Sequence, residues 1–178
     1  MSAPPIRFRP LAESDLPTLV EWFAEPEIAR WWNQPAEIES VRAKDLPRIE
    51  QRDPTQMWIA EIDEEDGGLL QSYLHVDYTE HDECVGIAEA VGIDYLIAGP
   101  HRGRRRGRHV LHAFSDWTLA HYPDASCCVA TPAQANEASW RALEYAGFSR
   151  VGECQPPDEP RAYVYVRGRE GHSTPSWT

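Results

Sequence analysis

One stretch of the chain, VGIDYLIAGPHRGRRRGRHVL at residues 91–111, combines residue types that can bind an anion. The pattern predicts a strand over 91–97, a loop of glycine and arginine over 99–108, and a helix over 104–121. Backbone N–H groups at a helix N-terminus attract anions, glycine lets the backbone approach a phosphate closely, and arginine adds charge-assisted hydrogen bonds. The stretch therefore predicts a phosphate-binding loop, although a solvated basic turn fits the loop residues equally well.

A second motif, NEASWRALEYAGF at residues 136–148, follows the strand expected over 125–131. By itself it predicts an amphipathic helix that ends at Gly147, because glycine readily adopts the left-handed conformation that terminates helices. The order of the two motifs carries more information than either motif alone.

Together the two motifs resemble the GCN5-related N-acetyltransferase superfamily. Its acetyl-CoA loop has the form (Arg/Gln)-x-x-Gly-x-(Gly/Ala), which matches Arg102 and Gly107, whereas Arg105 replaces the middle glycine. Its later pattern, N-x-x-(S/A)-x-x-x-(Y/L)-x-x-x-G-F, matches Asn136, Ser139, Leu143, Gly147 and Phe148. The resemblance implies the α/β (α+β) fold of that superfamily, with a mixed, mostly antiparallel sheet of about seven strands and helices on both faces. It also implies acetyl-CoA as the co-substrate.

A closer resemblance begins at the N-terminal segment IRFRPLAESDLPTLVEWFAEPEIARWW, residues 6–32. This segment is similar to aminoglycoside 6′-N-acetyltransferases and to the related acyltransferases that modify hydroxylysine in siderophore assembly. The QSY at 71–73, the GID at 92–94 and the PPDEP at 156–160 resemble the aminoglycoside branch, and the siderophore branch tends to carry histidine in place of Asp94. The resemblance implies acetyl transfer to the 6′-amine of an aminoglycoside, and hence antibiotic resistance.

Acetyl transfer from a thioester needs a neutral amine, donors for the oxyanion, and a proton or a positive environment for the departing thiolate. The resemblance implies that Asp94 takes the ammonium's proton, directly or through water; a solvent-facing strand end is the alternative. In the superfamily the fourth strand splays from the fifth and its backbone pairs with the pantetheine arm, which places the N–H of Ile97 or Leu96 near the thioester oxygen. The tyrosine that often protonates the thiolate is replaced by Leu143, so we expect the thiolate to leave as such or to be protonated by water. The residues assigned to acetyl-CoA are Tyr95, Leu96, Ile97, Arg102, Gly103, Arg104, Arg105, Arg106, Gly107, Asn136 and Ser139.

A small cationic amine, such as a polyamine sugar, requires an acidic pocket, and the segment before the fourth strand is rich in carboxylates. The resemblance places the acceptor there. The residues assigned to it are Trp31, Trp32, Gln71, Tyr73, Asp77, Glu80, Asp82, Glu83, Glu89, Asp94 and Asp158. A solvated loop explains any single carboxylate equally well, and the two tryptophans fit the core as well as a sugar-stacking surface.

The elements that must position these residues follow from hydrophobic periodicity and turn residues. Strands are expected over 6–11, 57–62, 69–76, 91–97, 125–131, 148–154 and 161–167, and helices over 13–23, 38–49, 104–121 and 136–146. We expect a glycine turn over 64–68 and an acidic loop over 77–90. The order predicts one domain over 5–167, followed by a flexible tail over 168–178.

Composition limits the remaining possibilities. A chain of 178 residues fits one domain, and its net charge of −12 argues against general nucleic-acid binding. No apolar run is long enough for a membrane helix, and the N-terminus lacks a secretion signal, so a cytoplasmic location is expected. The four cysteines and seven histidines lack metal-ligand spacing, so no metal is expected. Either a monomer or a homodimer is consistent with the sequence.

Three functions remain open at this point. The first is an aminoglycoside 6′-N-acetyltransferase, and the second is an acyltransferase for hydroxylysine or another small amine. The third is a non-catalytic coenzyme A sensor or partner module, suggested by Arg105 in the loop and Leu143 in place of tyrosine.

Overall fold

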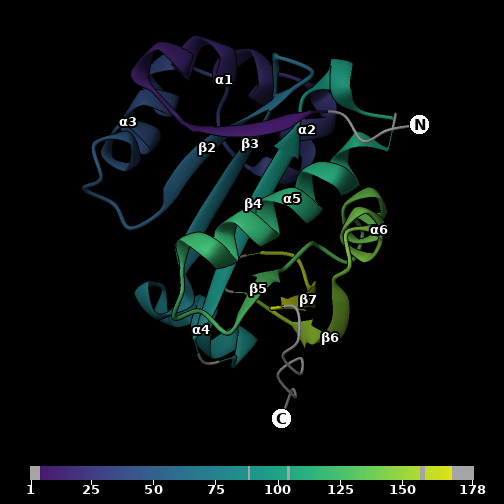
Figure 1. The fold of residues 1–178 in the computed structure, drawn as a ribbon. Helices are drawn as coiled ribbons and strands as arrows, with labels where there is room; N and C mark the ends of the chain where they lie inside the picture. The colour runs from purple at the N-terminus through teal and green to yellow at the C-terminus, as the bar shows by residue number, and fades with distance from the viewer. Residues whose placement is uncertain (1–4, 88, 104, 157–158, 170–178) are drawn as a thin grey trace. The chain divides into compact units, whose positions relative to one another are not determined.

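The computed structural model describes residues 5–169, apart from 88, 104, 157–158 and the side chains of 80–82 (Figure 1). The strands are β1 (Ile6–Pro10), β2 (Gln56–Ile62), β3 (Glu65–Leu74), β4 (Ala90–Ile97), β5 (Cys127–Ala130), β6 (Ser149–Cys154) and β7 (Ala162–Gly168). The α-helices are α1 (Leu16–Phe23), α2 (Pro26–Trp32), α3 (Ile38–Ile49), α4 (Thr79–Val85), α5 (Arg106–His121) and α6 (Glu137–Tyr145), and the short 3-10 helices are η1 (Glu13–Asp15), η2 (His75–Asp77) and η3 (Gly99–His101). None of the helices in this described part is long and apolar enough to cross a membrane.

The strands form one seven-stranded sheet in the order β1-β2-β3-β4-β5-β7-β6. The pairs β1–β2, β5–β7 and β6–β7 are antiparallel, whereas β4 runs parallel to β5, with Ala90–Gly92 opposite Cys127–Val129. The predicted fold class, a mixed and mostly antiparallel sheet with helices, is therefore confirmed.

The chain divides into two compact units, and β3 and β4 contribute residues to both. The first unit comprises Met1–Gln71 with Tyr95–Arg104, and the second comprises Ser72–Asp94 with Arg105–Thr178. The single domain expected over 5–167 stays a prediction.

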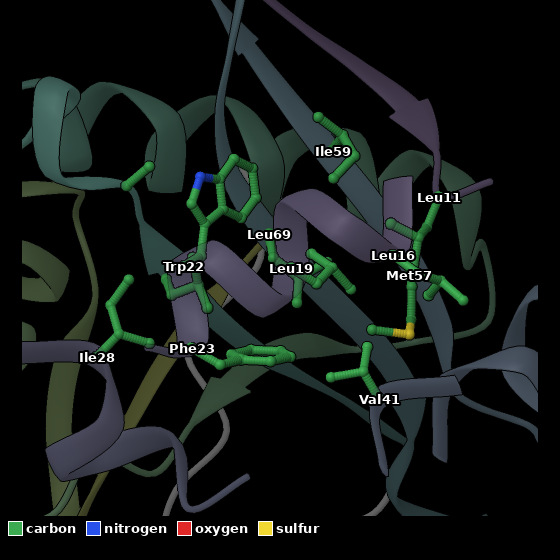
Figure 2. Packing of buried hydrophobic residues seen from close by; sticks show 12 residues of the cluster. Leu11, Leu16, Leu19, Trp22, Phe23, Ile28, Val41, Met57, Ile59 and Leu69 are labelled. Carbon is green, nitrogen blue, oxygen red and sulfur yellow. The ribbon is translucent and has the colours of Figure 1, made fainter. Parts of the chain in front are cut away.

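The core of the first unit is built around the apolar face of α1. Leu16, Leu19 and Phe23 recur at helical spacing and are almost completely buried. Figure 2 shows these side chains gathered with Val41 of α3 and Met57 of β2. Each such buried side chain contributes about 1.5–3 kcal/mol of transfer free energy, so this cluster is a main source of the unit's stability.

The second unit is organised around α5 and the central strand β5. Val110, Leu111 and Phe114 form the buried face of α5, and all four residues of β5 are buried. Cys127 and Cys128 of β5 are free thiols. Burial raises the pKa of both thiols, which are small residues of the core.

Two local predictions were wrong. The turn expected over 64–68 is made instead by Asp63 (φ 55°) and Glu64 (φ 68°), and β3 already begins at the next residue. Gly67 and Gly68 are strand residues, and their missing side chains allow close packing: a Cβ at Gly68 would lie 2.5 Å from the Leu96 carbonyl oxygen. Sequence patterns alone do not distinguish this use of glycine from a turn.

The acidic segment 77–90 is likewise more than a loop, because it contains α4. Its sequence is polar throughout most of its length, which hides a helix from periodicity arguments. Val85 at the end of α4 and Ile87 just beyond it are buried in a core cluster with β5, β6 and β7 residues. This tertiary anchoring explains the helix.

The pKa values of two aspartates in the first unit are shifted in opposite directions. Burial raises the pKa of Asp45, although Gln34 Nε2 donates to its Oδ2 at 2.9 Å and Arg48 lies nearby. Burial also acts to raise the pKa of Asp15, but bonds from Arg9 and from a backbone N–H outweigh burial and lower it. Their contributions to stability therefore depend on pH in opposite directions.

We predict that Asp45→Asn and Asp15→Asn change the pH dependence of unfolding with opposite signs. A carboxyl with a raised folded-state pKa loses its stability contribution as pH rises, so wild type should lose stability relative to Asp45→Asn from about pH 4 upward. A carboxyl with a lowered pKa loses its contribution as pH falls, so wild type should lose stability relative to Asp15→Asn below about pH 4. Urea unfolding at several pH values measures both, and equal slopes for the two variants would contradict the assignment.

Candidate functional site

A tyrosine and an aspartate form the centre of the candidate site in the second unit. Tyr73 of β3 is 8% exposed, and its side chain hydrogen-bonds the half-buried Asp94 of β4. Burial raises the pKa of Tyr73 well above its ordinary value, and the negative charge of Asp94 raises it further. The phenol therefore stays protonated and donates its hydrogen to the carboxylate.

Aromatic rings fix the position of this tyrosine. The Tyr73 ring stacks on His75 with centroids 5.8 Å apart, and it forms a T-shaped contact with Tyr78, with centroids 5.1 Å apart. On β4, a Cβ at Gly92 would lie 2.6 Å from Tyr73 Cζ, so the first residue of the GID motif must be glycine for the ring to fit. The packing gives the hydroxyl, and through it the Asp94 carboxylate, a fixed orientation.

Several carboxylates expected to hold the acceptor lie in the same unit. Asp77 at the end of η2, Glu83 on α4 and Glu89 before β4 are all exposed. Glu89 has a positive φ of 56°, and its carbonyl accepts the N–H of Ser126 at 2.8 Å. The side chains of Glu80 and Asp82, and all of Asp158, lie outside the described residues.

The glycine–arginine loop contains two left-handed residues. Gly103 has φ 75°, and nothing lies within 4 Å of the position that a Cβ would take. Arg105, which replaces the glycine of the family pattern, also has a positive φ of 58° and directly precedes α5. The arginine thus keeps the backbone conformation that the missing glycine would favour, at a cost of about 1–2 kcal/mol.

Arg106 and Gly107 begin α5, and both are half-buried. The first N–H groups of a helix have no partner within that helix, and they attract negative charge. The basic start of this 16-residue helix is a feature that fits a diphosphate. Arg104 lies outside the described residues.

Arg102, the first residue of the loop pattern, is engaged by an acidic side chain. Its guanidinium forms an ion pair with Glu25, and a second, longer contact of 3.8 Å reaches Glu27. Glu25 also accepts the backbone N–H of Gly99 at 3.2 Å. Sequence reasoning missed Glu25; its one signal is its place before Pro26 within the segment that resembles the family.

The N–H groups of Leu96 and Ile97, the two candidates for binding the thioester oxygen, point to opposite sides of β4. The Leu96 carbonyl faces Gly68 of β3, and the Ala98 N–H donates to the Gly67 carbonyl at 2.9 Å. Backbone groups alternate sides along a strand, so those of Ile97 face away from β3. The side chains of Tyr95 and Ile97 are half-buried, and that of Leu96 belongs to the first unit's core.

The residues of the second motif support their own helix. Asn136 caps α6, because its side-chain oxygen accepts the backbone N–H of Ser139 at 3.3 Å. Leu143 is fully buried. A left-handed Gly147 follows α6, as predicted.

The aromatic and amide residues expected at the acceptor differ in their surroundings. Trp32 stacks on Phe23 with centroids 6.0 Å apart and donates to Gln34 at 3.3 Å, which places it against the core. Trp31 instead carries the guanidinium of Arg30 over its ring at 4.6 Å. Gln71 on β3 is buried. Of the two tryptophans, Trp31 is therefore the better candidate for a ligand surface.

Among the described side chains, no group of three or more potential metal ligands occurs.

A family model and several solved structures are similar to this chain. A family model described as "Acetyltransferase (GNAT) domain" matches residues 12–156. The chain is similar to the aminoglycoside acetyltransferase AAC(6′)-Ib in complex with coenzyme A and kanamycin, with 27% identity over 93% of this chain and 96% of the other, at a TM-score of 0.80. It is also similar to AAC(6′)-Ib in complex with paromomycin and acetyl-CoA, with 26% identity over 93% and 94% of the two chains and the same TM-score.

A more distant structure shares the fold alone. RimL, a ribosomal L7/L12 alpha-N-protein acetyltransferase, is 18% identical over 92% of this chain and 90% of its own, at a TM-score of 0.73. Comparison with curated proteins gives no match. The family match covers most of the chain, and the chain therefore belongs to the GNAT family and is an acetyl-CoA-dependent acyltransferase.

Proposed function

We propose that the protein transfers the acetyl group of acetyl-CoA to the 6′-amine of an aminoglycoside. The observation that carries this proposal is the hydrogen-bonded pair of Tyr73 and Asp94, in a unit that also exposes Asp77 and Glu83. Support comes from the structures of AAC(6′)-Ib with kanamycin and with paromomycin, to which this chain is similar. An ammonium group on a sugar matches these carboxylates in charge.

Asp94 acts as the proton acceptor in this proposal. An amine must be neutral before it can attack, and a carboxylate close to the ammonium can take its proton directly or through water. A carboxylate is a weak base toward an amine, so its position matters more than its basicity. The Tyr73 hydroxyl supplies that position by donating to Asp94 from a ring packed against Gly92.

Acetyl-CoA supplies the activated acetyl group as a thioester. The backbone N–H of Ile97, which faces away from β3, is the proposed donor to the thioester oxygen, in preference to that of Leu96. The start of α5 at Arg106 is the proposed diphosphate site. With the buried Leu143 in place of a tyrosine, we propose that the thiolate leaves unprotonated or takes its proton from water.

The biological setting is part of the same proposal. Acetylation of a 6′-amine removes a positive charge from the antibiotic, which would give resistance. A cytoplasmic location would supply acetyl-CoA.

The direct test is release of free thiol from acetyl-CoA in the presence of different amines. We expect turnover with kanamycin and tobramycin and none with hydroxylysine, because a multiply charged sugar engages several carboxylates at once. Mass spectrometry of the product should locate one acetyl group on the 6′-amine. Turnover with hydroxylysine alone would replace the proposal with the siderophore-type function, and thiol release with neither would exclude both acceptors.

We predict that Asp94→Asn lowers kcat by about 10²–10⁴-fold while leaving coenzyme A affinity unchanged, because it removes a proton acceptor. Tyr73→Phe should lower kcat by about tenfold, because it removes a hydrogen bond to a charged group. Steady-state kinetics with kanamycin, together with calorimetric binding of coenzyme A, measures both effects.

Tyr122→Phe is the matched control. Its hydroxyl lies 3.2 Å from Ser72 Oγ in the same unit and is not bonded to Asp94 in the described contacts. We expect its kcat to match wild type. If Tyr73→Phe and Tyr122→Phe had equal effects, the proposed orientation of Asp94 by Tyr73 would be wrong.

A further inference from the structure

The half-buried carboxylate of Glu25 holds the beginning of the glycine–arginine loop in the first unit. One oxygen of Glu25 accepts the Gly99 N–H at 3.2 Å, and the other forms the ion pair with Arg102. These two contacts bracket η3, the single helical turn with which the loop begins. Both side chains of the ion pair are largely shielded, at 24% and 30% exposure, so the pair is screened less than a surface pair.

Glu25 is itself held by its own backbone. It is the N-cap of α2, and Pro26 restricts it to the extended conformation observed, with φ −65° and ψ 125°. Its N–H donates to the Trp22 carbonyl, and its carbonyl accepts the N–H groups of Ile28 and Ala29. The carboxylate is thus presented from a rigid corner between α1 and α2.

Gly99 completes the contact by leaving room for it. A Cβ at this position would lie 2.9 Å from Glu25 Oε2 and 3.2 Å from an Arg102 guanidinium nitrogen. A larger residue would therefore push the carboxylate away from both of its partners.

We propose that Glu25 is a positioning residue for the coenzyme A loop, and that Arg102 binds Glu25 rather than the diphosphate. We call the three residues Glu25, Gly99 and Arg102 the loop latch. The latch sets where the chain enters the loop, and it neutralises the first arginine of the motif. This inference rests on the proposal that residues 102–107 hold coenzyme A.

A negative charge beside a diphosphate site can change coenzyme A affinity in two ways, and the two changes have opposite signs. If Glu25 only competed with the diphosphate for Arg102, removing its charge would strengthen coenzyme A binding. If Glu25 orders the loop, removing its charge weakens binding, because the loop must then be ordered at the expense of binding free energy. The direction of the change therefore distinguishes the two roles.

The test measures calorimetric binding of coenzyme A to wild type, Glu25→Gln, Arg102→Gln and the double variant, each at low and high salt. We expect each single variant to weaken binding about fivefold and the double variant to be no worse, because both substitutions break the same latch. The double variant keeps the net charge, so its salt dependence should equal that of wild type. Tighter or unchanged binding by Glu25→Gln overturns the proposal, as do additive effects with a flatter salt dependence in the double variant.

Two further variants separate positioning from general stability. Asp15→Asn breaks a comparable ion pair with Arg9 in the same unit, and it should lower the melting temperature without changing coenzyme A affinity. An equal loss of affinity in Asp15→Asn would show that Glu25 acts only through stability.

Arg105→Gln removes an exposed loop charge and should both weaken binding and flatten its salt dependence. If it did neither, the loop would not hold coenzyme A and the latch proposal would fall with it. None of these measurements contains an amine, so their outcome is independent of the aminoglycoside proposal.

Discussion

The constraint on which the proposed chemistry depends is the fixed orientation of one carboxylate. A flexible aspartate at a strand end would be hydrated and mobile, and it would seldom face an amine. Tyr73 removes that freedom because its buried hydroxyl has Asp94 as an acceptor and its ring is packed on three sides. Burial keeps the phenol protonated, so this donor persists over the pH range in which an amine begins to lose its proton.

The glycine–arginine loop is a basic segment in a strongly acidic chain, and its arginines differ in their surroundings. Anion binding there does not require every arginine to face the ligand, since backbone N–H groups and a helix N-terminus supply much of the attraction. Arg102 is already paired with Glu25. Arg105 has a left-handed backbone, a conformation that glycine adopts readily, so the arginine at this position keeps a backbone that suits glycine.

Sequence reasoning located the strands, the long helices and both motifs, because these rest on local periodicity and on glycine at helix ends. It failed where glycine served packing between strands, as at Gly68, and where a polar segment was made helical by burial of Val85 in a distant cluster. Both failures have one cause: the deciding contact is with residues far away in the sequence. Asp94 and Tyr73 were each singled out by their motifs, but the bond between them was not foreseen.

The sequence by itself determined the family, the fold class and the two motifs, since these depend on residue types at set spacings along the chain. Only the tertiary structure decided which partners the predicted site residues take. It places Trp32 against the core, Asn136 on its own helix, Arg102 on Glu25 and Tyr73 on Asp94. A side chain's partner is chosen by packing and desolvation among several elements, and no pattern along a single chain records that choice.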